Sequence, residues 1–350
     1  MKSQSHCQSG LQLLRLKLIR INYFMPIDIV IATSRTERNT RPPALAVVVA
    51  LALAVIVNPL TTFAGMDETM KAFQQSEFSF ARSVSEVPFY PIGWAQDNFY
   101  PRAEFKDERG VLPMGAVVEN TFNVGLVLPA YVAKRDMLLL GTDIAWDSLD
   151  VRSGPYQDQS ILRLTPVVGW LHQFGEQETV GVFVAPIFSK ELRNDQPWGT
   201  SGYGGIIGMH HFNDEWQLLY GGVYEYSFGL STFYPYLGAL WSPTPKCSLA
   251  LVFPWPTFSY VPSDRWLLQV GLAPGGSSWV VRGNGYETTQ SLGSWNLTAG
   301  AGYRLHGKIW LFAGAGLAGL RGLKIESGDN QAQLESKPAA VFTLALQIRP

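Results

Sequence analysis

The sequence predicts one all-β chain, an antiparallel transmembrane β-barrel that is closed on itself and has about 12–14 strands. Apolar and polar residues alternate with a period of two along many runs, as they do on the two faces of a strand. The composition combines 34 glycines and 13% aromatic residues with only 16% charged residues, against roughly 25% in ordinary globular chains. Short and long connectors also alternate between the runs, which is typical of outer-membrane barrels.

Residues 1–64 are predicted to be an N-terminal extension and signal peptide. Ala44–Val57 is a run of 14 apolar residues that follows three arginines. This length suits a signal-peptide core of about 7–15 residues, whereas a spanning helix needs about 20. Pro59 ends the run, and Thr62-Phe63-Ala64 offers small residues for cleavage after Ala64. A short membrane anchor is the alternative reading, and either Met1 or Met25 is the start.

Removal of the leader leaves an acidic chain without a disulfide. Seven of the 27 basic residues and two of the 28 acidic ones lie in 1–64, so 20 basic and 26 acidic residues remain, a net charge of −6. This balance disfavours nucleic acid as a partner. Cys7 lies in the leader, so Cys247 remains alone and cannot form an intramolecular disulfide.

Residues 65–350 are predicted to form the barrel, with 66–115 as a poorly defined strand plus loop. The strand would cover 77–86, although its alternation is weak. The segment 88–101 is aromatic and is punctuated by prolines, so it is read as a packed loop that caps or enters the barrel.

The clearest unit is the hairpin Ser294–Gly322, which turns at His306-Gly307. Similar alternation defines strands within 117–128, 136–146, 160–171, 180–188 and 216–226. From Val118 to Trp170, the even-numbered strand residues are assigned to lipid, among them Phe122, Leu126, Leu140, Ile144, Trp146 and Trp170.

Connector lengths give the strand count. Short links are expected near 129–135, 172–177, 211–215, 243–245, 274–277 and 305–308. The links at the other end of the barrel are expected to be long, and they fall near 149–159, 191–200, 284–291 and 322–338. Two brief links, near 228–232 and 261–264, belong to the same end by their position in the chain. This pattern predicts fourteen strands that end with 339–349, of which 77–86 and 278–283 are weak, so twelve is the alternative. An even number of strands keeps both chain ends in the periplasm.

A soluble β-sandwich or lipocalin-like barrel is the competing architecture. Its inward faces would be apolar. Here the minority face carries Gly, Thr, Asn and scattered charges, which are too small and polar to fill a core. The membrane barrel is therefore favoured.

The inward faces supply the candidate lumen residues. Charged residues at buried positions must be paired with other charges or hydrated. Those on the polar face therefore either line a water-filled lumen or form a network that closes it. The lumen-lining candidates are Glu119, Asp143, Asp147, Arg163, Glu225 and Arg304. The aromatic-girdle candidates are Trp146, Trp170, Trp216, Trp295 and Tyr303.

Motifs for catalysis, metals and cofactors are weak. Gly302–Lys308 matches the spacing of a phosphate-binding loop, but a strand follows it where that motif requires a helix. His210 and His211 lie in one tight turn beside acidic residues, whereas a metal site needs ligands from several elements. We expect no metal, no cofactor and no enzymatic activity, and we interpret the histidines as solvated turn residues.

Two short motifs carry a family resemblance. Pro262-Ser263-Asp264-Arg265-Trp266, followed by Gly275-Gly276-Ser277-Ser278-Trp279, resembles a family of uncharacterised bacterial outer-membrane β-barrel proteins, a domain of unknown function. The resemblance covers roughly 75–350 and implies the compartment and the fold, without catalytic residues. One departure is the end Arg349-Pro350, where outer-membrane proteins commonly carry an aromatic residue that the insertion machinery reads.

The expected location is the bacterial outer membrane, with its lipid and its assembly machinery as partners and an unknown oligomeric state. The expected function is a passive pore or small-solute transporter. A structural or surface-binding barrel with a plugged lumen is the alternative, and an outer-membrane lipid enzyme is a third. The sequence leaves the solute open.

Overall fold

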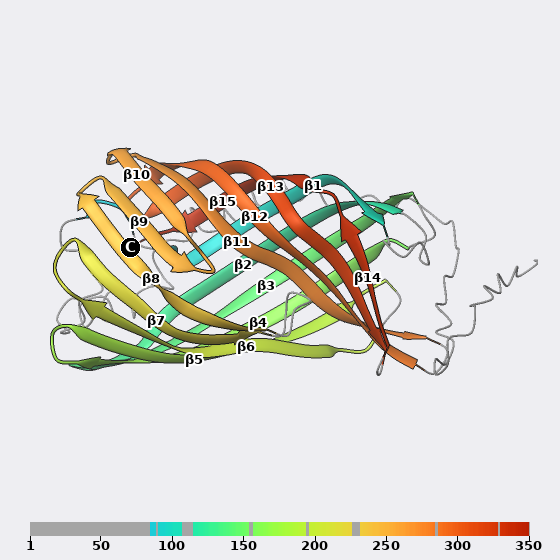
Figure 1. Ribbon diagram of the computed structural model, residues 1–350, viewed down its shortest axis with the longest axis horizontal. Coiled ribbons are helices and arrows are strands. Elements are labelled where there is room, and N and C mark those ends of the chain that lie inside the picture. The colour runs from blue at the N-terminus through green and yellow to red at the C-terminus, as the bar shows by residue number, and fades with distance from the viewer. Residues whose placement is uncertain are drawn as a thin grey trace, which may run out of the picture. The chain divides into compact units, whose positions relative to one another are not determined.

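The computed structural model describes residues 85–88, 90–106, 115–153, 157–193, 196–225, 232–283, 286–327 and 330–349. Within these residues the regular structure is one antiparallel sheet of fifteen strands (Figure 1). The strands are β1 (Gly93–Lys106), β2 (Gly115–Val132), β3 (Asp136–Ser153), β4 (Gln159–Phe174), β5 (Glu178–Glu191), β6 (Gly199–His211), β7 (Trp216–Glu225), β8 (Thr232–Thr244), β9 (Cys247–Phe253), β10 (Thr257–Ser263), β11 (Trp266–Gly283), β12 (Tyr286–His306), β13 (Ile309–Ser327), β14 (Asn330–Ser336) and β15 (Ala339–Ile348). The predicted cleavage site lies outside the described residues.

The sheet closes into a barrel, as predicted. Strands β1 to β13 pair in sequence order, and β15 pairs with both β13 and β1. Strands β14 and β15 occupy one position in the ring, because Arg321↔Ser336 and Ala318↔Ala339 belong to the same register against β13. The circumference therefore has fourteen strand positions, one fewer than the fifteen strands. A closed barrel satisfies its backbone hydrogen bonds without leaving an edge.

The first strand corrects one prediction. Gly93–Lys106 is β1, where a packed loop was predicted as far as Pro101. The pairing with β2 shifts between Tyr100 and Ala103, so Pro101 lies in a bulge. A bulge tolerates proline and breaks the alternation of faces, which made the strand resemble a loop. The predicted strand 77–86 lies outside the described residues, apart from Ser85 and Glu86, which are not in a strand.

Two further boundary predictions are wrong, and their errors cancel in the strand count. The predicted links leave one strand between 245 and 261, but this segment is β9 and β10, joined at 254–256. Pro254 and Pro256 cannot donate hydrogen bonds to a sheet, so the strand ends there. Conversely, the link predicted at 274–277 lies inside β11, where Gly275 and Gly276 pair with Ser294 and Gly293.

The barrel has two distinguishable ends. The short-link end carries the links 133–135, 175–177, 212–215, 245–246, 264–265 and 307–308, together with Gly93 and Ile348. It lies at the left of Figure 1. The long-loop end is the opposite one. The link at 264–265 therefore joins the short-link end, which corrects its predicted membership of the opposite set.

The outer surface is a band of apolar side chains. On β3, Leu140, Ile144 and Trp146 are 45%, 47% and 47% exposed. Their neighbours Ala145 and Asp147 are each 1% exposed. Further exposed apolar residues of the band are Leu126, Leu164, Val168, Trp170, Val182, Val184, Ile206, Leu237, Leu251, Leu268, Val270, Leu297 and Leu317. This chain therefore has the fold and the surface of an outer-membrane β-barrel. Among the described residues, no helix is long and apolar enough to span a membrane.

Candidate functional site: the barrel interior

A polar cluster joins four strands inside the barrel. Arg321 of β13 forms an ion pair with Glu119 of β2, and both side chains are at most 5% exposed. The Arg321 guanidinium also lies over the ring of Tyr100 on β1, 4.7 Å from its centroid. Asn296 Nδ2 of β12 donates a hydrogen bond to the Tyr100 hydroxyl at 3.0 Å. Buried charges need such partners because the interior cannot solvate them alone.

A β-bulge turns Arg321 inward. The pairing of β12 with β13 shifts between Gly293↔Gly322 and Trp295↔Gly319, which adds one residue to β13. Leu320 takes up this residue with a φ of 45° and is 86% exposed. Strict alternation from Leu317, which is exposed, would place Arg321 on the lipid face. The bulge exchanges the faces and moves the charge inside.

A second interior cluster lies on β3 and β4. Arg163 Nε donates a hydrogen bond to Asp147 Oδ2 at 2.8 Å, and the Asp147 side chain is 1% exposed. Asp143 accepts hydrogen bonds from Trp94 Nε1 at 2.9 Å and from Asn123 Nδ2 at 3.1 Å. These contacts connect β1 to β4 on the inner face.

The structure places all six lumen candidates on the polar interior face, but it does not bring them into one site. Asp143, Asp147 and Arg163 share the cluster on β3 and β4, and Glu119 belongs to the cluster with Arg321. Glu225 is 3% exposed and pairs in register with Tyr203. Arg304 lies farther toward the short-link end, over the Trp310 ring at 4.7 Å. Whether these residues line a water-filled pore stays a prediction.

The girdle candidates lie on the outer face. Trp146, Trp170 and Trp216 are 40–47% exposed, whereas Trp295 and Tyr303 are half-buried. Trp216 stacks on Trp241 with a centroid distance of 5.3 Å, and Tyr303 contacts Trp266 at 5.0 Å. Trp170, Trp216 and Tyr303 lie close to the short-link end, while Trp146 and Trp295 lie farther along their strands. Their position at the membrane boundaries stays a prediction.

An apolar cluster fills the interior toward the long-loop end. Trp279 of β11 is 1% exposed and packs with residues from several other strands. The cluster contains Ala103, Phe105, Leu149, Ile161, Trp279, Leu292, Leu334 and Ala339. The end of β11 also reaches β6, since a Cβ on Gly199 would lie 2.5 Å from Val280. These contacts pack apolar side chains against one another across the interior at this end.

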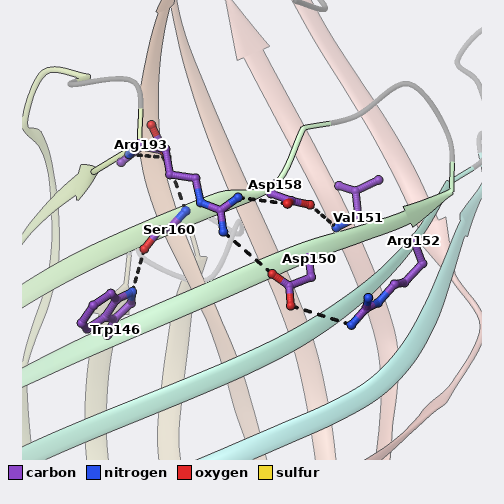
Figure 2. Close-up of polar contacts among 8 residues, drawn as sticks. Trp146, Asp150, Val151, Arg152, Asp158, Ser160 and Arg193 are labelled. Atoms are coloured by element: carbon purple, nitrogen blue, oxygen red, sulfur yellow. Dashed lines mark hydrogen bonds and ion pairs between the residues drawn. The ribbon is translucent and has the colours of Figure 1, made fainter. Parts of the chain in front are cut away.

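A polar network braces the rim of the same end (Figure 2). Arg193 lies 3.0 Å from Asp158 and 3.9 Å from Asp150, measured between charged atoms. Asp158 Oδ1 also accepts a hydrogen bond from the backbone N–H of Val151 at 2.7 Å. Trp146 Nε1 donates to Ser160 Oγ at 2.7 Å, which ties the outer band to the rim.

The segment before β1 occupies the short-link mouth. Val87 is 6% exposed and packs with Val261, Leu267 and Trp310. The backbone N–H of Glu86 donates to the carbonyl of Pro245 at 2.7 Å. A small cavity beside this segment is lined by Val87, Pro88, Tyr90, Ser248, Ala250, Thr257, Ser259, Gln269 and Arg349. The segment before β1 therefore packs against inward-facing residues of β10, β11 and β13 at the short-link end.

The barrel wall is shorter at strands β9 and β10 than at β11, and this section is called the low wall. Strands β9 and β10 have seven residues each, whereas β11 has 18. Along its β10 edge, β11 pairs only as far as Gly271, and Leu272 N–H donates to the Pro256 carbonyl at 3.0 Å. Among the described strands, none pairs with that edge beyond this point. Aromatic side chains border the low wall. The ring centroids of Tyr236 and Trp255 are 5.8 Å apart, and those of Tyr234 and Phe253 are 6.4 Å apart.

The histidines among the described residues lie at the short-link end, as predicted, and His172 and His210 have acidic partners there. His172 Nδ1 lies 2.8 Å from Asp136, and His210 Nδ1 lies 2.7 Å from Glu178. Among the described residues, no group of three or more His, Cys, Asp or Glu side chains could hold a metal ion. The absence of enzymatic activity stays an expectation.

Comparison with known proteins finds structural likeness without a sequence match. No protein-family model matches the chain, and no curated protein matches it in sequence. The predicted membership of an uncharacterised family therefore stays a prediction. An outer membrane channel from Pseudomonas putida F1 is 13% identical, with a TM-score of 0.41 over 75% of this chain and 98% of that one. A FadL homologue from Pseudomonas aeruginosa is 11% identical, with a TM-score of 0.35 over 73% and 89%.

The translocator domain of the autotransporter NalP from Neisseria meningitidis is also similar, at 12% identity and a TM-score of 0.29 over 73% of this chain and 88% of that one. A channel and an autotransporter domain thus resemble the chain to a similar, weak degree.

Sequence reasoning missed three interior residues, namely Tyr100, Trp279 and Arg321. Tyr100 lies in the segment that was read as a loop, and Trp279 lies in the strand that was judged weak. Arg321 follows a bulge that alternation cannot reveal. The only available signal was the cost of a lipid-facing arginine, which favours a face exchange before position 321.

Proposed function

We propose that this chain is a bacterial outer-membrane channel for small, weakly polar molecules, which pass through the low wall beside the β9–β10 hairpin. The observation that carries the proposal is the uneven pairing of β11. It pairs with β12 through Gly283 but with β10 only to Gly271. A path through the side of the barrel avoids both packed ends.

The chemistry of the low wall supports the solute class. Tyr236, Phe253 and Trp255 provide aromatic surface, which suits small apolar or aromatic molecules. The charged pairs of the interior lie elsewhere, on β2, β3, β4 and β13. An ion that followed the axis would meet the Trp279 cluster at one end and Val87 at the other.

Uptake of the dye 1-N-phenylnaphthylamine by intact bacteria tests the proposal, because this dye fluoresces when it reaches phospholipid. Expression of the protein should raise the initial uptake rate several-fold. Ala273→Trp should remove that gain, because Ala273 lies on the inner face opposite Asn296, next to the low wall. Ala299→Trp is the matched control, since Ala299 lies on the lipid face of β12.

Planar-bilayer recording separates the axial route from the lateral one. The unchanged protein should conduct ions poorly, and Trp279→Ala should raise conductance because it opens the apolar cluster. Large steady conductance in the unchanged protein would favour the passive axial pore. The packing of both ends also favours a structural barrel, and absence of both dye uptake and conductance would select it.

A further inference from the structure

Asp97 is a carboxylate on the lipid-facing side of β1. Its neighbours on the strand point inward, because Trp94 contacts Asp143 and Asn98 accepts a hydrogen bond from Thr343. Asp97 lies between them on the opposite face. It pairs in register with Phe122 on β2 and Leu344 on β15, two residues of the apolar outer surface.

Strand length predicts that this carboxylate lies near the middle of the membrane-spanning part of β1. Leu344, its register partner, is in the middle of the ten-residue β15 (Ala339–Ile348). A strand of about 9–11 residues crosses the hydrocarbon region, so a span that starts near Ile348 at the short-link end has Leu344 in its inner part. Asp97 is four residues from Gly93, where β1 begins at the short-link end.

A polar neighbour accompanies Asp97. The amide Nδ2 of Asn120 donates a hydrogen bond to Asp97 Oδ1 at 2.8 Å. Asn120 lies on the outer face of β2, two residues from Phe122. The surrounding surface is apolar, with Phe99 37% and Phe342 49% exposed. Ionisable groups within a membrane almost always face protein or water, so this pair is misplaced if the face meets lipid alone.

We propose that the outer face of β15, β1 and β2 around Asp97 and Asn120 packs in the membrane against the same face of a second copy of this chain. Every copy inserts in the same direction, so a closed pair must have its two-fold axis along the membrane normal. That symmetry brings residues of equal depth together. The Asp97–Asn120 pair of one copy therefore meets the same pair of its partner.

The pair is complementary to itself. The Asp97 carboxyl group offers further acceptor sites, and the Asn120 amide has a second N–H. Each copy can then donate to the other and accept from it. The neighbouring outer face of β13 is shallow, since Ala313 and Ala315 are exposed there. Small side chains allow close approach between neighbouring proteins within a membrane.

Single cysteines test the inference in outer membranes, in a Cys247→Ser background. Phe342→Cys lies beside Asp97 on the outer face, and Val184→Cys on β5 is the matched control at 55% exposure. A short bis-maleimide should convert most of the Phe342→Cys protein to a dimer and little of the Val184→Cys protein. Adding Asp97→Leu and Asn120→Leu should lower the dimer yield at least several-fold, while the heat-modifiable folded band is retained.

Three outcomes would overturn the proposal. Equal cross-linking at both positions would show random collision. A fluorophore at Phe342→Cys that brominated lipid quenches as strongly as one at Val184→Cys would show that the face meets lipid. A fluorophore at Phe342→Cys that is shielded without a dimer of this chain would assign the face to a different protein. If Asp97→Leu and Asn120→Leu lose the folded band, Asp97→Ala with unchanged folding provides the same comparison.

Discussion

Arg163 Nε donates a hydrogen bond to Asp147 Oδ2 across 2.8 Å inside the barrel, between the neighbouring strands β4 and β3. Asp147 is 1% and the Arg163 side chain 14% exposed. Removal of one partner leaves the other charge buried without compensation, which typically costs about 3–5 kcal/mol. Asp147→Ala and Arg163→Ala should each lower the free energy of unfolding by about that amount in denaturant titrations of the refolded barrel.

The double variant and an exposed pair are the controls. Asp147→Ala with Arg163→Ala should cost less than the sum of the two single changes, since neither charge is then left alone. Arg102→Ala breaks the exposed pair with Glu104, whose side chains are 62% and 56% exposed. That change should cost at most about 1 kcal/mol. Equal costs for the buried and exposed pairs would mean that water fills this part of the lumen.

The apolar outer band predicts that a charged residue on the outer face of β3 lowers the free energy of unfolding. Ile144 is 47% exposed between interior residues Asp143 and Ala145. Ile144→Arg should lower the free energy of unfolding in lipid vesicles by about 2–4 kcal/mol, because the guanidinium then faces hydrocarbon. Ile144→Leu should have little effect. A tolerated arginine would indicate that this face meets water, and the soluble barrel would then be favoured again.

Cysteine labelling reports the two faces directly. In a Cys247→Ser background, a fluorophore on Leu126→Cys should be quenched by a lipid-soluble quencher, since Leu126 is 37% exposed on the outer face. A fluorophore on Asp143→Cys should escape that quencher, because Asp143 contacts Trp94 and Asn123 inside the barrel. Reaction of Asp143→Cys with an aqueous thiol reagent then measures how wet the lumen is. A lipid-quenched label at position 143 would reverse the assignment of faces.

The packing of the segment before β1 predicts which of its residues a water-soluble reagent can reach. Val87 is 6% exposed in its apolar cluster, and Tyr90, only three residues later, is 60% exposed. With a water-soluble maleimide, Val87→Cys should react at least about tenfold more slowly than Tyr90→Cys, because reagent must wait for local opening. Leu267→Ala should accelerate labelling at Val87→Cys. Similar rates at both positions would show that the segment does not occupy the mouth.

The leader remains a prediction from sequence. N-terminal sequencing or intact mass of the membrane form should show a chain that begins at Gly65, since cleavage is expected after Ala64. A retained leader would remove the argument for general export. It would leave the barrel assignment, which rests on 85–349, unchanged.

Where strands are regular, the sequence by itself determined the face of each residue. Side chains alternate along β2, β3 and β4, so the lipid assignment of Leu140 and Trp146 and the interior assignment of Asp147 followed from period two alone. The closed antiparallel barrel and the count of fourteen positions were also within reach. The count survived because β1 took the place of the predicted strand 77–86, and because one missed turn at 254–256 offset one falsely predicted turn at 274–277.

The tertiary structure alone decided the rest, because a single inserted residue exchanges the two faces of a strand and leaves no periodic signal. The bulge at Leu320 brings Arg321 to Glu119, and the bulge after Tyr100 lets Phe105 join the Trp279 cluster. Contacts between strands that are not neighbours depend on the register of every strand pair around the fourteen positions. The hydrogen bond between Asn296 and Tyr100 is one such contact. The sequence also could not predict that Asp97 lies on the outer face, because a segment that is interpreted as a loop has no faces to assign.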